Sequence, residues 1–211
     1  GQVFYYRLVT LDADGARSAL TAPVKGFLYP NSVSVDIARS FGDGTRPQDY
    51  RLVALPGQVD QSLEGTMAGE GRESWQAYWY DGSNSDFLVK FDGSSTFTFT
   101  PGTGFWVISD SSWTVQESFS TVPLKGDSIT TIDLRNGWNV ISNPLDRDVS
   151  WDAIRAQNGR QSLEPLWAFK GSFSQAVTFS SAKAGEAFYF FNGQGLDELE
   201  PHFFGQPADI V

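Results

Sequence analysis

The chain has 211 residues, of which 40% are hydrophobic, 15% aromatic and 19% charged, and its formal net charge is −10 at pH 7. This length suits one large or two small domains, which must bury a core without disulfides because the chain contains no cysteine. The acidic balance disfavours nucleic-acid binding, which depends on basic patches, and no apolar run is long enough for a membrane helix. We expect no cofactor, because one histidine and no cysteine exclude the common metal sites.

The first segment predicts a β-hairpin. Residues 3–11 are rich in β-branched and aromatic side chains, Asp12-Ala13-Asp14-Gly15 is typical of a turn, and residues 16–24 return as a second strand. The order of these parts resembles the last two strands of a fibronectin type III domain, and we assign residues 1–22 to such a terminal hairpin. Two strands are marginal by themselves, so we expect the hairpin to pack on the rest of the chain or on another chain.

The remaining residues carry an internal repeat. Several segments recur in the same order while their spacing drifts, as a duplicated module with altered loops would show. The matched pairs are 23–26 with 123–126, 32–39 with 128–135, 50–56 with 138–144, 79–82 with 168–171, and 102–106 with 185–189. The repeat predicts two units, at residues 23–122 and 123–211.

Each unit follows the same series of elements. An alternating strand and an aromatic-led strand ending at a proline come first, followed by a short helix. In the second unit residues 150–159 predict that helix, with Ser150 as N-cap; in the first unit residues 60–64 are a weaker helix candidate. The last strands, 105–108 and 188–191, are apolar on both faces and are expected to be central strands. The predicted fold is all-β, with two tandem related β-sandwich-like units that have one short helix each, preceded by the hairpin remnant.

Three segments carry a resemblance to a known kind of module: 49–57, 101–109 and 137–144. They resemble a recurring β-rich C-terminal module that follows fibronectin type III repeats in large secreted proteins of Bacteroidota and related bacteria. The resemblance spans about residues 40–200. It implies an exported protein, often cargo of the type IX secretion system, at the outside or cell surface of a Gram-negative-type bacterium. It implies no particular reaction.

The best candidate for a binding surface is the aromatic segment 75–80. Alternation along a strand puts Trp75 and Trp79 on one face and Tyr78 and Tyr80 on the other. One face must be core, and the other is free to present rings on which sugars stack. The alternative is that both faces are buried in the sandwich. The candidate carbohydrate-binding residues, which add the nearby polar groups and a tryptophan expected to be exposed, are Trp75, Tyr78, Tyr80, Asp81, Asn84 and Trp113.

Acidic turns are weaker candidates for a site. Asp12 and Asp14 begin like a calcium loop, and Asp146 and Asp148 form a second close pair. Neither run has the downstream glutamate of a helix-loop-helix calcium site, and Asp-Gly turns are common for conformational reasons alone. His202 follows a proline near the end of the chain, and no nucleophile-elbow pattern accompanies it.

These patterns favour a non-catalytic protein. Our first hypothesis is an extracellular structural or adhesive module of a bacterial surface protein, self-assembling through strand edges, with other copies or adjacent domains as partners. The alternative is a carbohydrate-binding module that binds polysaccharide on an exposed aromatic platform. A hydrolase with paired carboxylates is a third hypothesis, since the separation of two acids is a three-dimensional quantity.

Overall fold

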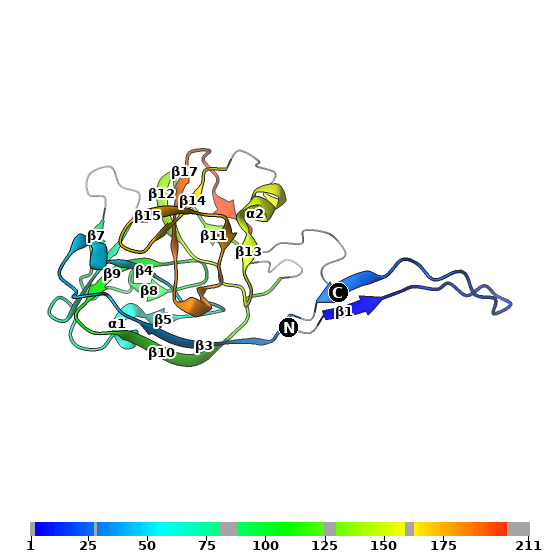
Figure 1. Ribbon diagram of the computed structural model, residues 1–211, viewed down its shortest axis with the longest axis horizontal. Helices are drawn as coiled ribbons and strands as arrows, with labels where there is room; N and C mark the ends of the chain where they lie inside the picture. Colours follow the sequence, from blue (N-terminus) through cyan, green and yellow to red (C-terminus); the bar gives the residue numbers. More distant parts are fainter. Residues whose placement is uncertain (1–2, 28, 81–87, 125–129, 159–162, 202–211) are drawn as a thin grey trace. The chain divides into compact units, whose positions relative to one another are not determined.

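The structure is a computed structural model that describes residues 3–27, 29–80, 88–124, 130–158 and 163–201. The chain divides into two compact units (Figure 1). The smaller unit contains Gly1–Pro30 and the larger unit is Asn31–Phe203.

The smaller unit is a long β-hairpin. Strand β1 (Val3–Tyr6) pairs antiparallel with β2 (Val24–Phe27), and Leu11 bridges to Arg17 near the tip. Asp12 forms the turn, because its Oδ1 accepts hydrogen bonds from the amides of Asp14 (3.0 Å) and Ala16 (2.8 Å). Every residue from 4 to 23 is exposed, so this hairpin has no core of its own. The hairpin extends beyond its predicted end at residue 22, since Val24–Phe27 pair with Val3–Tyr6.

In the larger unit the elements form two series along the chain. The first half consists of β3 (Ser32–Arg39), η1 (Pro47–Asp49), β4 (Arg51–Val53), β5 (Gln61–Ser62), α1 (Leu63–Thr66), β6 (Trp75–Trp79), β7 (Val89–Lys90), β8 (Thr98–Phe99), β9 (Phe105–Ser109) and β10 (Trp113–Ser120). The second half consists of β11 (Ile132–Asp133), β12 (Gly137–Ile141), β13 (Val149–Ser150), α2 (Trp151–Gln157), β14 (Leu166–Phe169), β15 (Phe173–Ala176), β16 (Thr178–Phe179), η3 (Ala182–Ala184), β17 (Phe188–Asn192) and β18 (Glu198–Leu199).

The same order of strand pairing occurs in both halves. One four-stranded sheet has the order β4-β9-β6-β7 and the other β12-β17-β14-β15. The flanking two-stranded pairs also correspond, β3 with β10 and β11 with β18, then β5 with β8 and β13 with β16. The registers match at central positions: Leu52 lies opposite Trp106 as Val140 lies opposite Tyr189, and Ser62 opposite Thr98 as Ser150 opposite Thr178. The two halves therefore share one order and one register of strand pairing.

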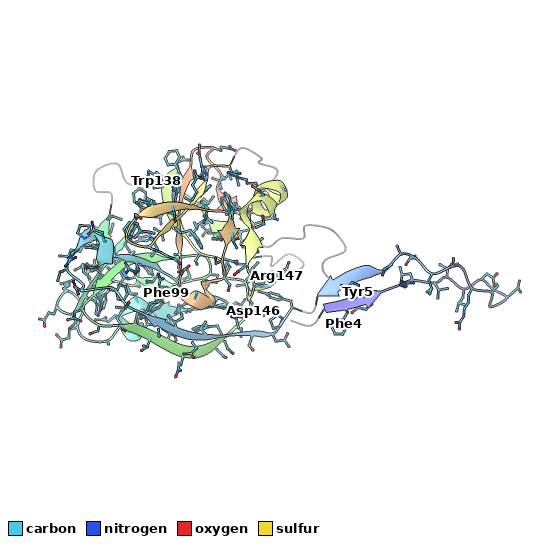
Figure 2. All side chains as sticks on the ribbon, viewed as in Figure 1. Phe4, Tyr5, Phe99, Trp138, Asp146 and Arg147 are labelled. Carbon is cyan, nitrogen blue, oxygen red and sulfur yellow. The ribbon has the colours of Figure 1, made fainter. Side chains whose placement is uncertain are left out.

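Each half buries one face of its four-stranded sheet. In the first half, alternate residues of β9, such as Phe105 and Val107, join a core with β3, β10 and α1. In the second half, Phe188 and Phe190 of β17 are buried in the same alternation and Trp151 of α2 contacts Phe190. Phe99 and Trp113 are fully buried in the first core, and Figure 2 shows Phe99 inside the larger unit.

Hydrogen bonds across the two halves join them into one body. Ala54 N donates to Gly185 O (3.3 Å), and Ser142 N donates to Gly102 O (2.9 Å). In each case the residue after the first strand of one sheet bonds the glycine before the last strand of the other. The Arg39 guanidinium donates to the carbonyls of Leu52 and Gly185, and burial lowers the pKa of Arg39. The halves are therefore interlocked.

The predicted all-β class is confirmed, since the described residues form antiparallel sheets with two short α-helices. Strands β9 and β17 are central in their sheets, as their sequences predicted. The helix predicted at 150–159 occurs as α2, and Ser150 is at its N-cap position, although its side chain makes no capping bond. The boundary predicted at residues 122 and 123 stays a prediction of sequence, and both predicted repeats contribute to the unit Asn31–Phe203. Within the described ranges, none of the helices has the length and apolar character needed to cross a membrane.

Candidate functional site

The second face of each four-stranded sheet carries the rings that make the candidate site. Trp106 lies between Phe105 and Val107 on β9, so alternation points it away from the first core. Tyr189 has the same place on β17, between Phe188 and Phe190. These two faces meet where the halves contact each other, a contact that we call the joint. There the ring centroids of Trp106 and Tyr189 are 5.9 Å apart, and both rings pack on a small hydrophobic cluster around Leu52.

The rings continue outward from this joint and remain half-buried or exposed at the surface. Together they line what we call the aromatic groove: Tyr50, Tyr78, Trp106, Phe169, Phe173, Trp138, Trp167 and Tyr189. Two hollows form it, one of about 270 Å³ that also touches Pro47 and Leu88, and one of about 260 Å³. Both are lined by Phe173, which is 49% exposed, so the two hollows adjoin at this ring. Figure 2 shows Trp138 near the surface of the larger unit.

Ring geometry differs between the two hollows. Around Trp106 the rings meet edge to face, at 74° with Phe169 and 85° with Phe173. In the other hollow, Trp138 stacks on Tyr189 with centroids 4.6 Å apart and planes within 7°, and Phe173 is within 23° of Tyr189. Both arrangements are favoured for aromatic pairs, so the rings support one another's orientation before any ligand arrives.

Two tyrosine hydroxyls in the groove are hard to ionise. Burial, together with a hydrogen bond between its hydroxyl and that of Tyr78, raises the pKa of Tyr50 to about 12. Burial also raises the pKa of Tyr189 to about 12, with a smaller contribution from Tyr80. Both hydroxyls therefore stay protonated at neutral pH.

Tyr78 is the predicted binding residue that the structure places in the groove, where it lies opposite Trp106 across β6 and β9. Tyr80 is buried and contacts Tyr189 edge to face. It lines a different hollow of about 180 Å³ with Arg135, whose Nη1 donates to Tyr80 O (2.8 Å) and whose guanidinium lies 4.2 Å from the Trp79 ring centre. That arginine is engaged in holding the halves together.

Two predicted binding residues lie in the core, which corrects the expectation that their rings are available. Trp75 is 2% exposed, contacts Phe91 at 4.6 Å and donates from Nε1 to Gly69 O. Trp113, which the polar residues before it predicted to be exposed, is 0% exposed, and its Nε1 donates to Thr66 Oγ1 (3.1 Å). It begins the long strand β10, whose alternate residues face the core, and this period outweighs the polar flank.

The remaining candidates lie outside the described residues or have internal roles. Asp81, Asn84 and His202 are among the residues that the structure does not describe. Asp146 forms an ion pair with Lys183 (2.9 Å), and Asp148 Oδ1 accepts from Ser181 N (2.8 Å). Across the described part of the chain, no group of three or more histidine, cysteine or acidic residues is placed to hold a metal ion.

Sequence reasoning missed most of the groove because its residues come from both halves. The signal for them was present in the central strands, which were recognised as apolar on both faces. One of those faces is core, and the other is the joint between the halves, where the outermost rings stay open. Only the packing of the two sheets decides which rings are covered.

No family model, curated protein or solved structure matches this chain. The resemblances to a fibronectin type III hairpin and to a secreted bacterial module therefore stay predictions from sequence.

Proposed function

We propose that this chain is a non-catalytic adhesive module of an extracellular bacterial surface protein, and that its aromatic groove binds a linear, uncharged polysaccharide. The observation that supports this is the groove itself, with eight rings around two adjoining hollows. The extracellular location rests on the resemblance of segments 49–57, 101–109 and 137–144 to modules of exported proteins.

The composition of the groove supports binding without reaction. Among the described residues, those that line its two hollows are aromatic apart from Pro47 and Leu88, and none of these is an acid, a base or a nucleophile of ordinary hydrolytic sites. A site that offers rings but no proton donor near neutral pH, beyond the tyrosine hydroxyls, holds a ligand and leaves its bonds intact.

The aromatic lining and the negative net charge of the chain also limit which ligands can bind. The C–H faces of a pyranose pack well on aromatic rings, while its hydroxyl groups remain in water above an open groove. The two hollows adjoin at the ring of Phe173, and two neighbouring hollows lined by rings suit a ligand of repeating units. A chain with a net charge of −10 repels anionic polymers, so we favour a neutral polysaccharide.

Affinity electrophoresis and depletion assays test the proposal with insoluble cellulose, β-1,3-glucan and mannan, and with alginate as the anionic comparison. We expect retention on at least one neutral polymer and none on alginate. The variant Tyr50→Ala should weaken that retention at least about tenfold, a loss of about 1.4 kcal/mol. Tyr5→Ala is the matched control, because Tyr5 is 70% exposed and belongs to the hairpin unit.

Intrinsic tryptophan fluorescence gives a second readout, since three tryptophans line the groove. Soluble oligosaccharides of the retained polymer should change the emission of the wild type, and Trp138→Phe should remove most of that change. Absence of retention on every neutral polymer, or unchanged retention by Tyr50→Ala, would overturn the proposal.

A further inference from the structure

The two four-stranded sheets differ in how their edges are protected. Strand β4 is covered at one edge, because Ala187 N donates to Leu52 O (3.2 Å) and Ala54 N donates to Gly185 O. Strand β12 is covered at the corresponding edge by the Thr103–Ile141 bridge and the bond from Ser142 N to Gly102 O. Both of these edges therefore lie against the other half of the molecule.

The opposite edges are β7 and β15, and only β7 has features that prevent pairing with another strand. Strand β7 has two residues, Val89–Lys90, and the exposed lysine is the residue type that native proteins use to prevent edge pairing. Strand β15 has four residues, Phe173–Ala176, without charge or proline, and its first three residues are exposed. Exposed Val177 follows it directly (80%). Among the described residues, β15 pairs only with β14, so its outer edge presents backbone groups next to apolar side chains. This is the arrangement that accepts an added strand.

The hairpin unit contains a strand that can pair with such an edge. Strand β1 also has four residues, Val3–Tyr6, and in the described structure it pairs only with β2. Its Phe4, Tyr5 and Tyr6 are 39%, 70% and 42% exposed, so apolar rings project from both faces (Figure 2). A two-stranded hairpin of this kind is marginal in water and gains stability by joining a larger sheet.

Charge favours a second copy of the chain as the source of the hairpin that joins β15. Residues 1–30 contain three basic and two acidic residues, a formal charge of +1, so the rest of the chain carries −11 of the total of −10. Two acidic bodies repel, whereas the hairpin is the part of one copy that the body of another attracts.

We propose that the hairpin of one copy adds its strand β1 to the edge strand β15 of a second copy. Main-chain hydrogen bonds supply the pairing, and alternate rings of β1 then lie beside Phe173 on the groove face of the sheet. The contact is heterologous, because each copy keeps a free hairpin and a free β15, and repetition yields an open chain of copies.

Sedimentation velocity of the full chain over a wide concentration range tests this inference without any polysaccharide. We expect wild-type protein to form a concentration-dependent series of oligomers. Gln175→Lys places a charge on β15 and should weaken association at least about tenfold. Thr114→Lys, on an exposed position of β10, is the matched control and should associate like the wild type.

The hairpin is tested by charge rather than by truncation, so that its fold is left alone. Arg7→Glu with Arg17→Glu changes the hairpin from +1 to −3 at exposed positions and should also weaken association. The decisive experiment mixes an edge-blocked copy, Gln175→Lys, with the charge-reversed hairpin copy, Arg7→Glu with Arg17→Glu. Each should be monomeric alone, and the mixture should form a 1:1 dimer that grows no further.

A wild type that stays monomeric at every concentration overturns the proposal. So does a mixture that stays monomeric although the wild type associates. Sedimentation is measured without polysaccharide, and retention is measured in a separate assay. Failure of this assembly therefore leaves the proposal for the groove standing, and the reverse also holds.

Discussion

The two halves of the larger unit share one order of strands but use it differently. Both place their last strand, β9 or β17, in the centre of a four-stranded sheet, and both bury alternate residues of that strand in their own core. In the first half, β3 and β10 are eight residues each and cover that core broadly. In the second half, the corresponding β11 and β18 are two residues each, and the longer helix α2 contributes Trp151 instead.

The contact between the two sheets is alike in both halves, whereas the outer layers are not. The register around Trp106 and Tyr189 is the same in both halves because these residues form the joint, where each sheet fits the other. The outer layers and sheet edges face water or loops, and they differ in length and charge. A shared joint also means that neither half should be stable alone, which leads to the first prediction.

Removing equivalent core rings should have the largest effect. Phe99 and Phe179 occupy matching places on β8 and β16, and both are 0% exposed. Phe99→Ala and Phe179→Ala should each lower the free energy of unfolding by about 3–5 kcal/mol. Each variant should still unfold in one transition, since damage to either half loosens the joint.

Urea unfolding followed by tryptophan fluorescence and by circular dichroism measures this. Coincident curves are expected for the wild type and for both variants. Two separate transitions in Phe99→Ala, one of them at the wild-type midpoint, would show that the halves fold independently.

The joint itself is tested at a glycine. Gly185 has φ of +71°, and a Cβ there would lie 2.8 Å from the Trp113 ring and 2.9 Å from Ile37, both in the first half. Gly185→Ala should cost about 1–3 kcal/mol from overpacking in addition to about 1–2 kcal/mol of left-handed backbone strain.

Gly137→Ala is the matched control for backbone strain. Gly137 has φ of +85° with open space around it, so only the strain should remain. Thermal unfolding of the two variants side by side measures the difference. Equal losses would mean that the halves separate easily enough to admit the methyl group.

Sequence alone predicted the strands and their roles better than the site. The segments 105–108 and 188–191 are apolar on both faces, and this was sufficient to predict central strands. Trp113 was predicted wrongly because its polar neighbours, Ser111 and Ser112, belong to the preceding turn and not to the strand that begins at Trp113.

The groove was beyond sequence reasoning for a different reason. Tyr78 was chosen from its own strand, but the rings that complete the groove come from η1, β9, β12, β14, β15 and β17 and their neighbours. Local pattern says that a strand has two apolar faces. It does not say which face meets another sheet, or how far that contact extends before the rings reach water.

A smaller difference between the halves lies at the starts of their helices. Ser62 Oγ accepts from Gly65 N (3.1 Å) at the N-cap of α1, whereas Ser150 makes no such bond at the N-cap of α2. Ser62→Ala should therefore lose about 1 kcal/mol, and Ser150→Ala much less. Urea midpoints of the two variants measure the difference, and a larger loss in Ser150→Ala would contradict the capping assignment.

The smallest expected effect is a dependence of stability on pH, because the groove holds one tyrosine from each half with a raised pKa. The pKa of Tyr189 is raised to about 12, largely by burial, so between about pH 10 and 12 the folded chain holds a proton that the unfolded chain releases. Stability must therefore fall as pH rises through this window. Solvent reaches part of the ring, which keeps the effect modest.

Tyr189→Phe removes this proton from the balance, and its unfolding midpoint should fall less between pH 9 and 11 than that of the wild type. Tyr5→Phe, in the exposed hairpin, should follow the wild type. A parallel fall in all three proteins would place the alkaline sensitivity elsewhere. A flatter profile in Tyr50→Phe as well, where burial also raises the pKa to about 12, would show that the two halves contribute alike to the groove that they share.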